Sequence, residues 1–506
     1  MKFQRSGGIL LHPTSLPGPH GIGDLGPQAY HFIDWLSEAG CRLWQVLPLG
    51  HTGYGDSPYQ CFSAFAGNPY LISPDLLVRD GLLTDADLAG ARPALSGGQD
   101  GPDDSTVDFS RAIPYKLALL QRAFDGFQHG GTAALREEFA VFRAGNAEWL
   151  DDYAVFMALK EQHGGGSWVD WPEAIRKREP GAVAEARQAL AQRALQFAFY
   201  QWLFYRQWGD LHSYARGKGI TVIGDIPIFV AEDSSDVWAH PELFHLDESR
   251  RPTVVAGVPP DYFSPTGQRW GNPLYRWEEH KRSGYDWWLK RFRASLQAVD
   301  VVRLDHFRGF AGYWEIPASN PTAEVGRWVP GPGADFLEAV RDSLSAAGGD
   351  LPIIAEDLGV ITADVIELRE RYHLPGMKIM QFGFSGPDNP FLPHNYGSHC
   401  VAYTGTHDND TARGWFDSAP KEERRFALRY LHCSSRSFVW ELMRGIWAST
   451  AVYALAPMQD ALGLGTQARM NYPSRLGGNW RWRAREDDLS RELAARLRDL
   501  SFLYLR

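Results

Sequence analysis

Short runs of apolar residues that stop abruptly at a polar residue recur along the whole chain. Residues on both faces of such a run are apolar, which is typical of strands in a parallel sheet, where both faces are buried. Eight runs fit this pattern. They are GGILLHPTS from residue 7, CRLWQVLPLG from 41, ITVIGDIPIFV from 220, VDVVRLDHFRG from 299, LPIIAEDLG from 351, GMKIMQFGF from 376, HCVAYTGTHDND from 399 and STAVYALAPMQD from 449.

Helical patterns separate several of these runs. Apolar residues recur at helical spacing in residues 26–40, 362–372 and 420–433, and Thr362 is a suitable N-cap for the second of these segments. Eight buried strands alternating with helices predict an α/β fold, a (β/α)8 barrel of the TIM type. In such barrels the active site lies at the carboxyl ends of the strands, where these runs carry their polar residues.

The spacing of the runs is irregular, and the long gaps predict insertions at the mouth of a single barrel that spans residues 1–506. After the second run, residues 51–219 are mostly helical in pattern and far exceed one barrel helix. Residues 231–293 form a second, loop-rich insertion, in which we expect residues 256–275 to cover the substrate. Too few residues follow the eighth run for a C-terminal β-sandwich domain.

Carboxylates end several of the runs, which suggests a chemistry. Asp305, Glu356 and Asp408 each follow a predicted strand, and Asp225 lies at the end of a fourth. Cleavage of a glycosidic bond needs one carboxyl group as a proton donor and another as an anion at the reacting carbon. A single Asp or Glu at a strand end is often a helix cap or a salt-bridge partner instead, and that alternative stays open for each residue taken alone.

Arg303 lies two residues before Asp305 and therefore on the same face of the predicted strand. We expect its charge to keep Asp305 ionised as a nucleophile, whereas a less compensated and partly desolvated Glu356 would keep its proton and act as the acid. Aromatic residues make up 13% of the chain, with 19 Trp. Most of them are expected in the core, but several lie in Gly- and Pro-rich loops, where aromatic rings suit the apolar faces of sugars.

Charge and cysteine content narrow the range of partners. The net charge is −10 and no basic stripe is present, which argues against nucleic acid and anionic membranes as partners. The four Cys are scattered, and no His/Cys cluster has metal-ligand spacing, so we predict free thiols and no metal.

The absence of a signal-like segment and of a long apolar span predicts a cytoplasmic protein, and we expect a monomer.

Several longer motifs carry a resemblance to a known family. RLDHFRGF, AEDLG, GTHDNDT, GDIPIFVAEDSSDVW, GVPPDYFSPTGQRWGNPLY, GYGDSPYQ and ARMNYP together resemble the amylomaltases, the 4-α-glucanotransferases of glycoside hydrolase family 77. The likeness extends from LLHPTSLPGP to GNWRWR, and the long loop motifs are not shared with ordinary α-amylases.

The resemblance implies a function and a role for each matching residue. The implied reaction is transfer of α-1,4-glucan segments between maltooligosaccharides or starch chains by a retaining double displacement without a cofactor, with large cyclic glucans as a further product. Asp305 matches the nucleophile, Glu356 the general acid/base and Asp408 the carboxylate that holds the distorted sugar. The matching substrate-binding residues are Tyr59, Asp225, Asp261, Gln268, Trp270, Arg303, His407, Asn471 and Tyr472.

Two other functions are weighed against glucan transfer. A hydrolase of the α-amylase type would use the same carboxylates but would pass the sugar to water. A glucan-binding protein without activity is disfavoured because all three carboxylates are present.

Overall fold

The centre of the protein is a parallel β-barrel. The computed structural model describes residues 3–92, 95, 105–260, 264–344, 350–473, 475 and 477–506. Eight parallel strands form one sheet in the order β10-β11-β12-β1-β2-β3-β6-β9. The N–H of Ala355 donates to the carbonyl of Pro375 (2.9 Å) and joins β9 to the residue before β10, which brings the two edges of the sheet together. The strands are β1 (Ser6–Leu10), β2 (Leu43–Gln45), β3 (Thr221–Ile226), β6 (Val301–Leu304), β9 (Ile353–Ala355), β10 (Gly376–Ile379), β11 (Cys400–Tyr403) and β12 (Tyr453–Pro457).

Each barrel strand coincides with one of the eight apolar runs, although β1 begins one residue before its run, so the predicted (β/α)8 fold is confirmed. Side chains that point inward from these strands fill the barrel, among them Leu43, Ile223, Val301, Val401 and Leu455, all buried. Their neighbours along each strand face the surrounding helices. Burial of both faces explains why the strands read as nearly continuous apolar runs.

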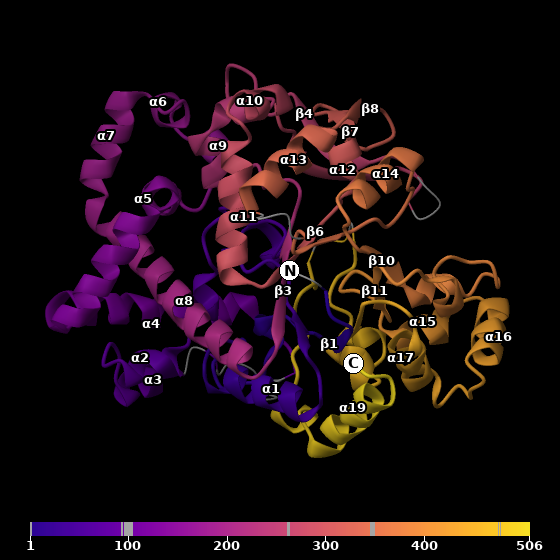
Figure 1. The fold of residues 1–506 in the computed structure, drawn as a ribbon. Coiled ribbons are helices and arrows are strands. Elements are labelled where there is room, and N and C mark those ends of the chain that lie inside the picture. Colours follow the sequence, from indigo (N-terminus) through magenta and orange to yellow (C-terminus); the bar gives the residue numbers. More distant parts are fainter. Residues whose placement is uncertain are drawn as a thin grey trace.

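Helices surround the barrel, and most follow a strand directly in the chain (Figure 1). They include the predicted helices at 26–40, 362–372 and 420–433. Thr362 stands at the N-cap position of its helix, but its side chain makes no capping hydrogen bond to the backbone. The helices nearest the barrel include α1 (Pro27–Glu38), α8 (Ala191–Gly217), α11 (Asp286–Ala298), α13 (Gly333–Leu344), α14 (Ala363–Arg371), α15 (Ala412–Ser418), α17 (Phe438–Ala448), α18 (Met458–Ala461) and α19 (Arg491–Leu503), whereas α16 (Lys421–Tyr430) lies farther out (Figure 1).

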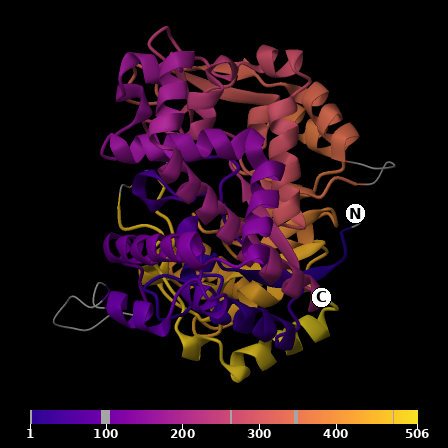
Figure 2. The same cartoon turned by 90° about the vertical axis from the view of Figure 1, so that its left-hand side faces the viewer.

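A helical layer lies between β2 and β3 in the chain. Helix α5 packs along α8, and this layer covers one side of the barrel (Figures 1 and 2). Buried aromatic rings such as Phe127, Phe199 and Trp202 hold the layer together. The bounds of the predicted insertions, 51–219 and 231–293, stay predictions. The helices are α2 (Pro74–Arg79), α3 (Asp85–Ala91), α4 (Phe109–Gly130), α5 (Ala133–Gln162), α6 (Glu173–Arg176) and α7 (Pro180–Ala189).

A second sheet was not anticipated from the sequence. Four antiparallel strands pair in the order β5-β4-β7-β8 beside the carboxyl end of β6 (Figure 1). Much of the segment 256–275, predicted as a covering loop, is therefore strand, because β4 and β5 pair with each other and β4 pairs with β7. The elements are β4 (Val254–Val258), β5 (Gln268–Pro273), β7 (Gly312–Pro317) and β8 (Arg327–Pro330), with α9 (Ser235–Ala239), α10 (Trp277–Arg282) and α12 (Arg308–Ala311) nearby.

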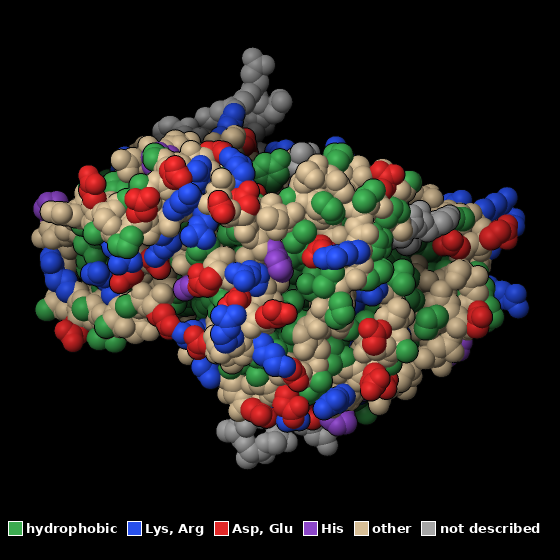
Figure 3. Space-filling model, turned by 90° about the horizontal axis from the view of Figure 1, so that it is seen from above, with side chains coloured by type: hydrophobic (Ala, Val, Ile, Leu, Met, Phe, Trp, Pro, Cys, Tyr) green, Lys and Arg blue, Asp and Glu red, His purple; other side chains and the backbone are tan. Residues whose placement is uncertain are grey.

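In the described part of the chain after β12, helices are present but no strand follows. None of the helices that the structure describes has the length and apolar character needed to cross a membrane. Acidic and basic side chains are interspersed over the face seen in Figure 3.

Candidate active site

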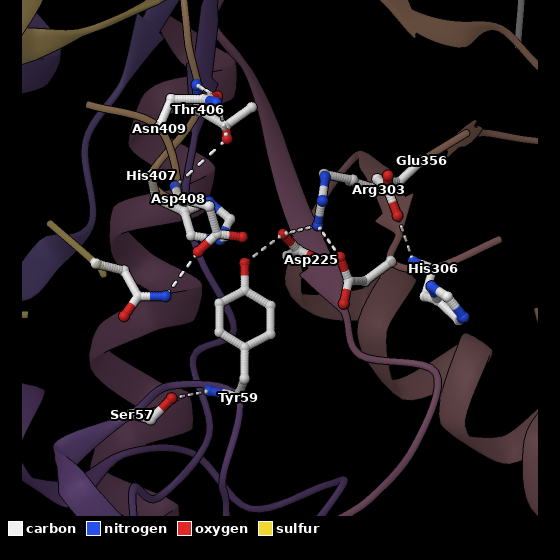
Figure 4. Close-up of polar contacts among 12 residues, drawn as sticks. Ser57, Tyr59, Asp225, Arg303, His306, Glu356, Thr406, His407, Asp408 and Asn409 are labelled. Carbon is white, nitrogen blue, oxygen red and sulfur yellow. Dashed lines mark hydrogen bonds and ion pairs between the residues drawn. The ribbon is translucent and has the colours of Figure 1, made fainter. Parts of the chain in front are cut away.

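The predicted acidic residues meet at the carboxyl end of the barrel (Figure 4). Asp225 lies near the end of β3, Asp305 follows β6 directly, and Glu356 follows β9 directly. Asp408 belongs to the segment after β11. The side chains therefore come from four different strands of one barrel, which is how the eight-stranded barrel assembles its active sites.

Arg303 joins two of these carboxylates. Its Nη1 atom lies 2.7 Å from Oδ2 of Asp225 and 2.8 Å from Oδ1 of Asp305. The hydroxyl of Tyr59 donates to the same oxygen of Asp225 at 2.9 Å. Burial works against the charge of Arg303, but the charges of Asp225 and then Asp305 outweigh it and raise the pKa of Arg303 well above its ordinary value. The arginine is therefore a fixed cation between the two acids.

Glu356 is held in a different environment. Its carboxyl oxygens accept the backbone N–H of His306 (2.7 Å) and of Leu358 (2.9 Å). Burial, and next the charge of Asp305, raise the pKa of Glu356 to about 7. The predicted acid therefore binds a proton far more tightly than an exposed Glu, as a general acid working near neutral pH must.

Asp225 is buried and incompletely hydrogen-bonded. Its Oδ1 atom has no partner among the described residues, whereas Oδ2 accepts from both Tyr59 and Arg303. Burial raises the pKa of Asp225 to about 6, with the charge of Asp305 adding to the rise and that of Arg303 opposing it. A free acceptor atom in a buried position is available to a ligand hydroxyl.

Asp408 forms a second charged group with His407 and Asn471. The Nδ2 atom of Asn471 donates to Oδ1 of Asp408 at 2.7 Å, and Nε2 of His407 lies 3.4 Å from Oδ2. Burial alone would raise the pKa of Asp408, but the charge and hydrogen bond of His407, together with Asn471, lower it well below its usual range. Asp408 is therefore an anion, and 47% of its side chain is exposed.

Tyr59 lies between the two charged groups (Figure 4). Its ring stacks on His407, with ring centres 5.1 Å apart and an interplanar angle of 18°. Trp480 packs against both rings, 5.9 Å from each. The sequence patterns assign Trp480 no role, although it lies in the GNWRWR motif, since only the tertiary contact places it at the site.

The antiparallel sheet brings Gln268 and Trp270 to the site on β5. The indole N–H of Trp270 donates to Oε1 of Gln268 at 3.2 Å. The ring of Trp270 meets His306 edge to face at 4.8 Å, and His306 is the residue directly after Asp305. The Nε2 atom of His306 is buried without a partner in the described part of the chain. Asp261, predicted for the same loop, lies outside the described residues.

Tyr472 is the predicted residue least closely connected to the carboxylates. Its ring lies under the guanidinium of Arg469, 4.3 Å from the ring centre, and its hydroxyl donates to the carbonyl of Thr466 at 3.4 Å. Arg469 in turn donates to the backbone carbonyl of Asp408 at 2.6 Å. Tyr472 therefore reaches Asp408 through Arg469, whereas Asn471 contacts the carboxylate directly.

Comparison with known proteins identifies the family. The model of glycoside hydrolase family 77, described as 4-alpha-glucanotransferase, matches residues 11–489. The chain belongs to this family. Two relatives called 4-alpha-glucanotransferase illustrate the similarity. The protein of Thermus thermophilus is 53% identical, with 99% of both chains covered. The chloroplastic/amyloplastic protein of Solanum tuberosum is 44% identical, with 99% of this chain and 87% of that protein covered.

Solved structures of the family share the whole fold. The amylomaltase from Streptococcus agalactiae in complex with acarbose superposes with a TM-score of 0.94 at 40% identity, covering 99% of this chain and 100% of that one. The amylomaltase from Corynebacterium glutamicum superposes with a TM-score of 0.77 over 98% of this chain and 75% of that chain. At 17% identity this second likeness is one of fold alone.

Proposed function

We propose that Asp305 and Glu356 carry out a retaining double displacement at the mouth of the barrel. The chain is a 4-α-glucanotransferase, an enzyme that moves segments of α-1,4-glucan from one chain to another. The observation that carries the proposed roles is the contrast between two neighbouring carboxyl groups: Asp305 is paired with Arg303, whereas Glu356 is buried with its pKa raised to about 7. Two carboxyl groups in opposite environments are what this chemistry requires.

In the first step Asp305 attacks the anomeric carbon of the donor glucan, and Glu356 gives its proton to the departing glycosidic oxygen. The C–O bond to the leaving chain breaks as the bond to Asp305 forms, which leaves a glucosyl ester. In the second step the ionised Glu356 takes the proton of an acceptor hydroxyl, which attacks the same carbon and releases Asp305. Two inversions give overall retention of the α configuration.

The remaining residues hold the sugar. We assign Asp408, Asp225 and His407 to the hydroxyl groups of the donor glucose, because each presents a polar group at the mouth of the barrel. Two buried atoms without a partner among the described residues, Asp225 Oδ1 and His407 Nδ1, are ready for hydroxyl groups. Tyr59, stacked on His407, offers an aromatic ring between the two charged groups.

Transfer instead of hydrolysis requires that an acceptor sugar reach the glucosyl ester before water does. We assign this selection to β5, whose Trp270 lies over His306 next to Asp305. A glucan acceptor gains contact with the indole, whereas a water molecule gains nothing from it. Asp261, Gln268, Asn471 and Tyr472 complete the proposed substrate-binding set.

We also propose that the reaction needs no metal. No group of three or more His, Cys, Asp or Glu is arranged to hold a metal in the parts of the chain that the structure describes. The cytoplasmic location, the monomeric state, the lack of a nucleic-acid partner and the formation of large cyclic glucans stay predictions.

Incubation with maltotriose alone tests the proposal. Transfer without a metal should give glucose and a ladder of longer maltooligosaccharides, both with and without a chelator. Release of glucose and maltose with no longer product would indicate an α-amylase type hydrolase. Loss of activity in chelator that calcium or zinc restores would disprove the metal-free mechanism.

A further inference from the structure

A large cleft lies at the end of the barrel opposite the catalytic carboxylates. Its volume is about 1090 Å³. The residues that line it include Ser6 and Thr221, the first residues of β1 and β3, and Tyr453, the first residue of β12. Since the proposed active site lies at the other ends of these strands, the reaction proposed above does not use this cleft.

The charge of the cleft is opposite to that of the whole chain. Among the described residues, its lining contains no Asp or Glu, although the chain carries a net charge of −10. Hydroxyl and amide side chains account for much of the remaining polar lining, among them Ser37, Thr221 and Tyr453. A concave surface with cations and hydrogen-bond donors concentrates anions. The five cationic residues are Arg5, Arg42, Lys218, Arg498 and Arg506.

Two of the cations form the inner wall and have a structural role. Arg5 and Arg506 both donate to the carbonyls of Trp447, Ser449 and Ala451 at the end of α17. Carbonyl groups satisfy their N–H groups but do not neutralise their charges, and no carboxylate of the described residues pairs with either arginine. Burial, and next the charge of Arg5, lower the pKa of Arg506 to about 9. The wall therefore carries two adjacent positive charges that no side-chain carboxylate of the described residues pairs with.

The outer cations are available to a ligand. Arg42 and Arg498 are exposed, and neither makes an ion pair with another described residue. Lys218 is already paired with Asp34 at 2.6 Å. The exposed side chains of Phe502 and Leu505 stand at the rim of the cleft. A ligand here would meet the guanidinium groups of Arg42 and Arg498 in front of those of Arg5 and Arg506.

We propose that this cleft binds a soluble small molecule with phosphate groups. Guanidinium groups bind phosphate oxygens through charge-assisted and often paired hydrogen bonds. The volume is slightly above the upper end of the range of small-molecule sites and exceeds what a single inorganic phosphate requires, so a diphosphate or a phosphorylated sugar fits better. The proposal goes beyond glucan transfer and does not depend on it.

Calorimetric titration of the full-length protein with inorganic pyrophosphate tests the site. We expect saturable binding at low ionic strength that weakens with added salt. The double variant Arg42→Ser/Arg498→Ser should bind pyrophosphate at least about tenfold more weakly, because it loses the charge-assisted hydrogen bonds of two guanidinium groups. The matched control, Arg436→Ser/Arg491→Ser, removes the same charge from exposed positions outside the cleft and should bind like the parent protein.

Two further measurements distinguish this cleft from the active site and from a surface that binds lipid. Transfer activity on maltotriose should be unchanged in both double variants, since the substitutions lie at the far end of the barrel. Flotation with vesicles of anionic phosphatidylglycerol should not capture the protein. No binding of pyrophosphate, equal loss in the control variant, or capture by vesicles without binding of pyrophosphate would each overturn the proposal, the last in favour of a lipid surface.

Discussion

Arg303 lies 2.8 Å from the carboxylate of Asp305 and reaches it with the same nitrogen that binds Asp225. The arginine is almost completely buried, so the ion pairs are little screened by solvent. This arrangement explains why the strand VVRL runs into a group of charges at the mouth of the barrel. A cation placed two residues before the proposed nucleophile shares a face of the strand with it.

Replacement of Arg303 by Met should move the basic limb of the pH–rate profile. The arginine lowers the pKa of both Asp225 and Glu356, although burial keeps both values raised. Without it, Glu356 should hold its proton to a pH above about 7, so the basic limb of kcat/KM should shift upward while kcat falls. Steady-state rates from about pH 4 to 9 measure the shift, with replacement of the exposed Arg269 by Met as a control. An unmoved limb would mean that Arg303 acts only by positioning.

Asp305→Asn should abolish turnover and leave glucan binding largely intact. The amide keeps the size of the side chain but cannot form the glucosyl ester, so we expect kcat to fall by roughly 10⁴-fold or more. Binding of maltooligosaccharides by calorimetry should change little. Residual turnover within about tenfold of the parent enzyme would exclude Asp305 as the nucleophile.

A crystal structure should place the carboxyl groups of Asp305 and Glu356 about 5 to 5.5 Å apart, as in retaining enzymes.

Glu356 should make the folded protein less stable as the pH rises. Its pKa is raised from 4.5 to about 7 in the folded state, so the native protein binds this proton more tightly than the unfolded chain. The contribution of Glu356 to the free energy of unfolding should therefore be lost between about pH 4.5 and 7. Denaturant unfolding of the parent and of Glu356→Gln at about pH 4.5 and pH 8 measures it. The variant should lack this part of the pH dependence, and equal pH dependence in both proteins would contradict the assignment.

Trp270→Ala should raise the ratio of hydrolysis to transfer. The acceptor glucan loses its contact with the indole, whereas water loses nothing, so the glucosyl ester should react more often with water. Reducing-sugar release compared with the maltotriose ladder gives the ratio, and Trp328→Ala on the outer strand β8 is a suitable control. A lower rate with an unchanged ratio would remove Trp270 from the acceptor site.

The barrel could be predicted because its signal is local. Each strand is buried on both faces, so runs such as IIA and CVAY are apolar throughout and stop where the mouth of the barrel begins. The carboxylates at those ends are then brought together by the closure of the barrel. The predicted positions of Asp225, Asp305, Glu356 and Asp408 followed from this rule, and the structure places all four at one end.

The antiparallel sheet and the contacts of Trp480 could not be predicted in the same way. Strand β5 (QRWGNP) and strand β8 (RWVP) contain Gly or Pro and show no clear alternation of apolar residues. Strand β5 pairs with β4, and β8 pairs with β7. Strands β4 and β7 pair with each other although they are far apart in the chain, so the sheet depends on a tertiary contact. Trp480 likewise meets Tyr59 from the opposite end of the chain, which no local pattern encodes.

Arg5 and Arg506 bind the same three carbonyls, so the two ends of the chain are neighbours on the side of the molecule away from the mouth. A short peptide could therefore join them and make the backbone circular without approaching the substrate. New ends could be opened in the exposed Gly-rich turn at residues 163–166, between α5 and α6. For the same reason, the enzyme could be attached to a solid support through residues at this side, and the mouth of the barrel would then face the solution.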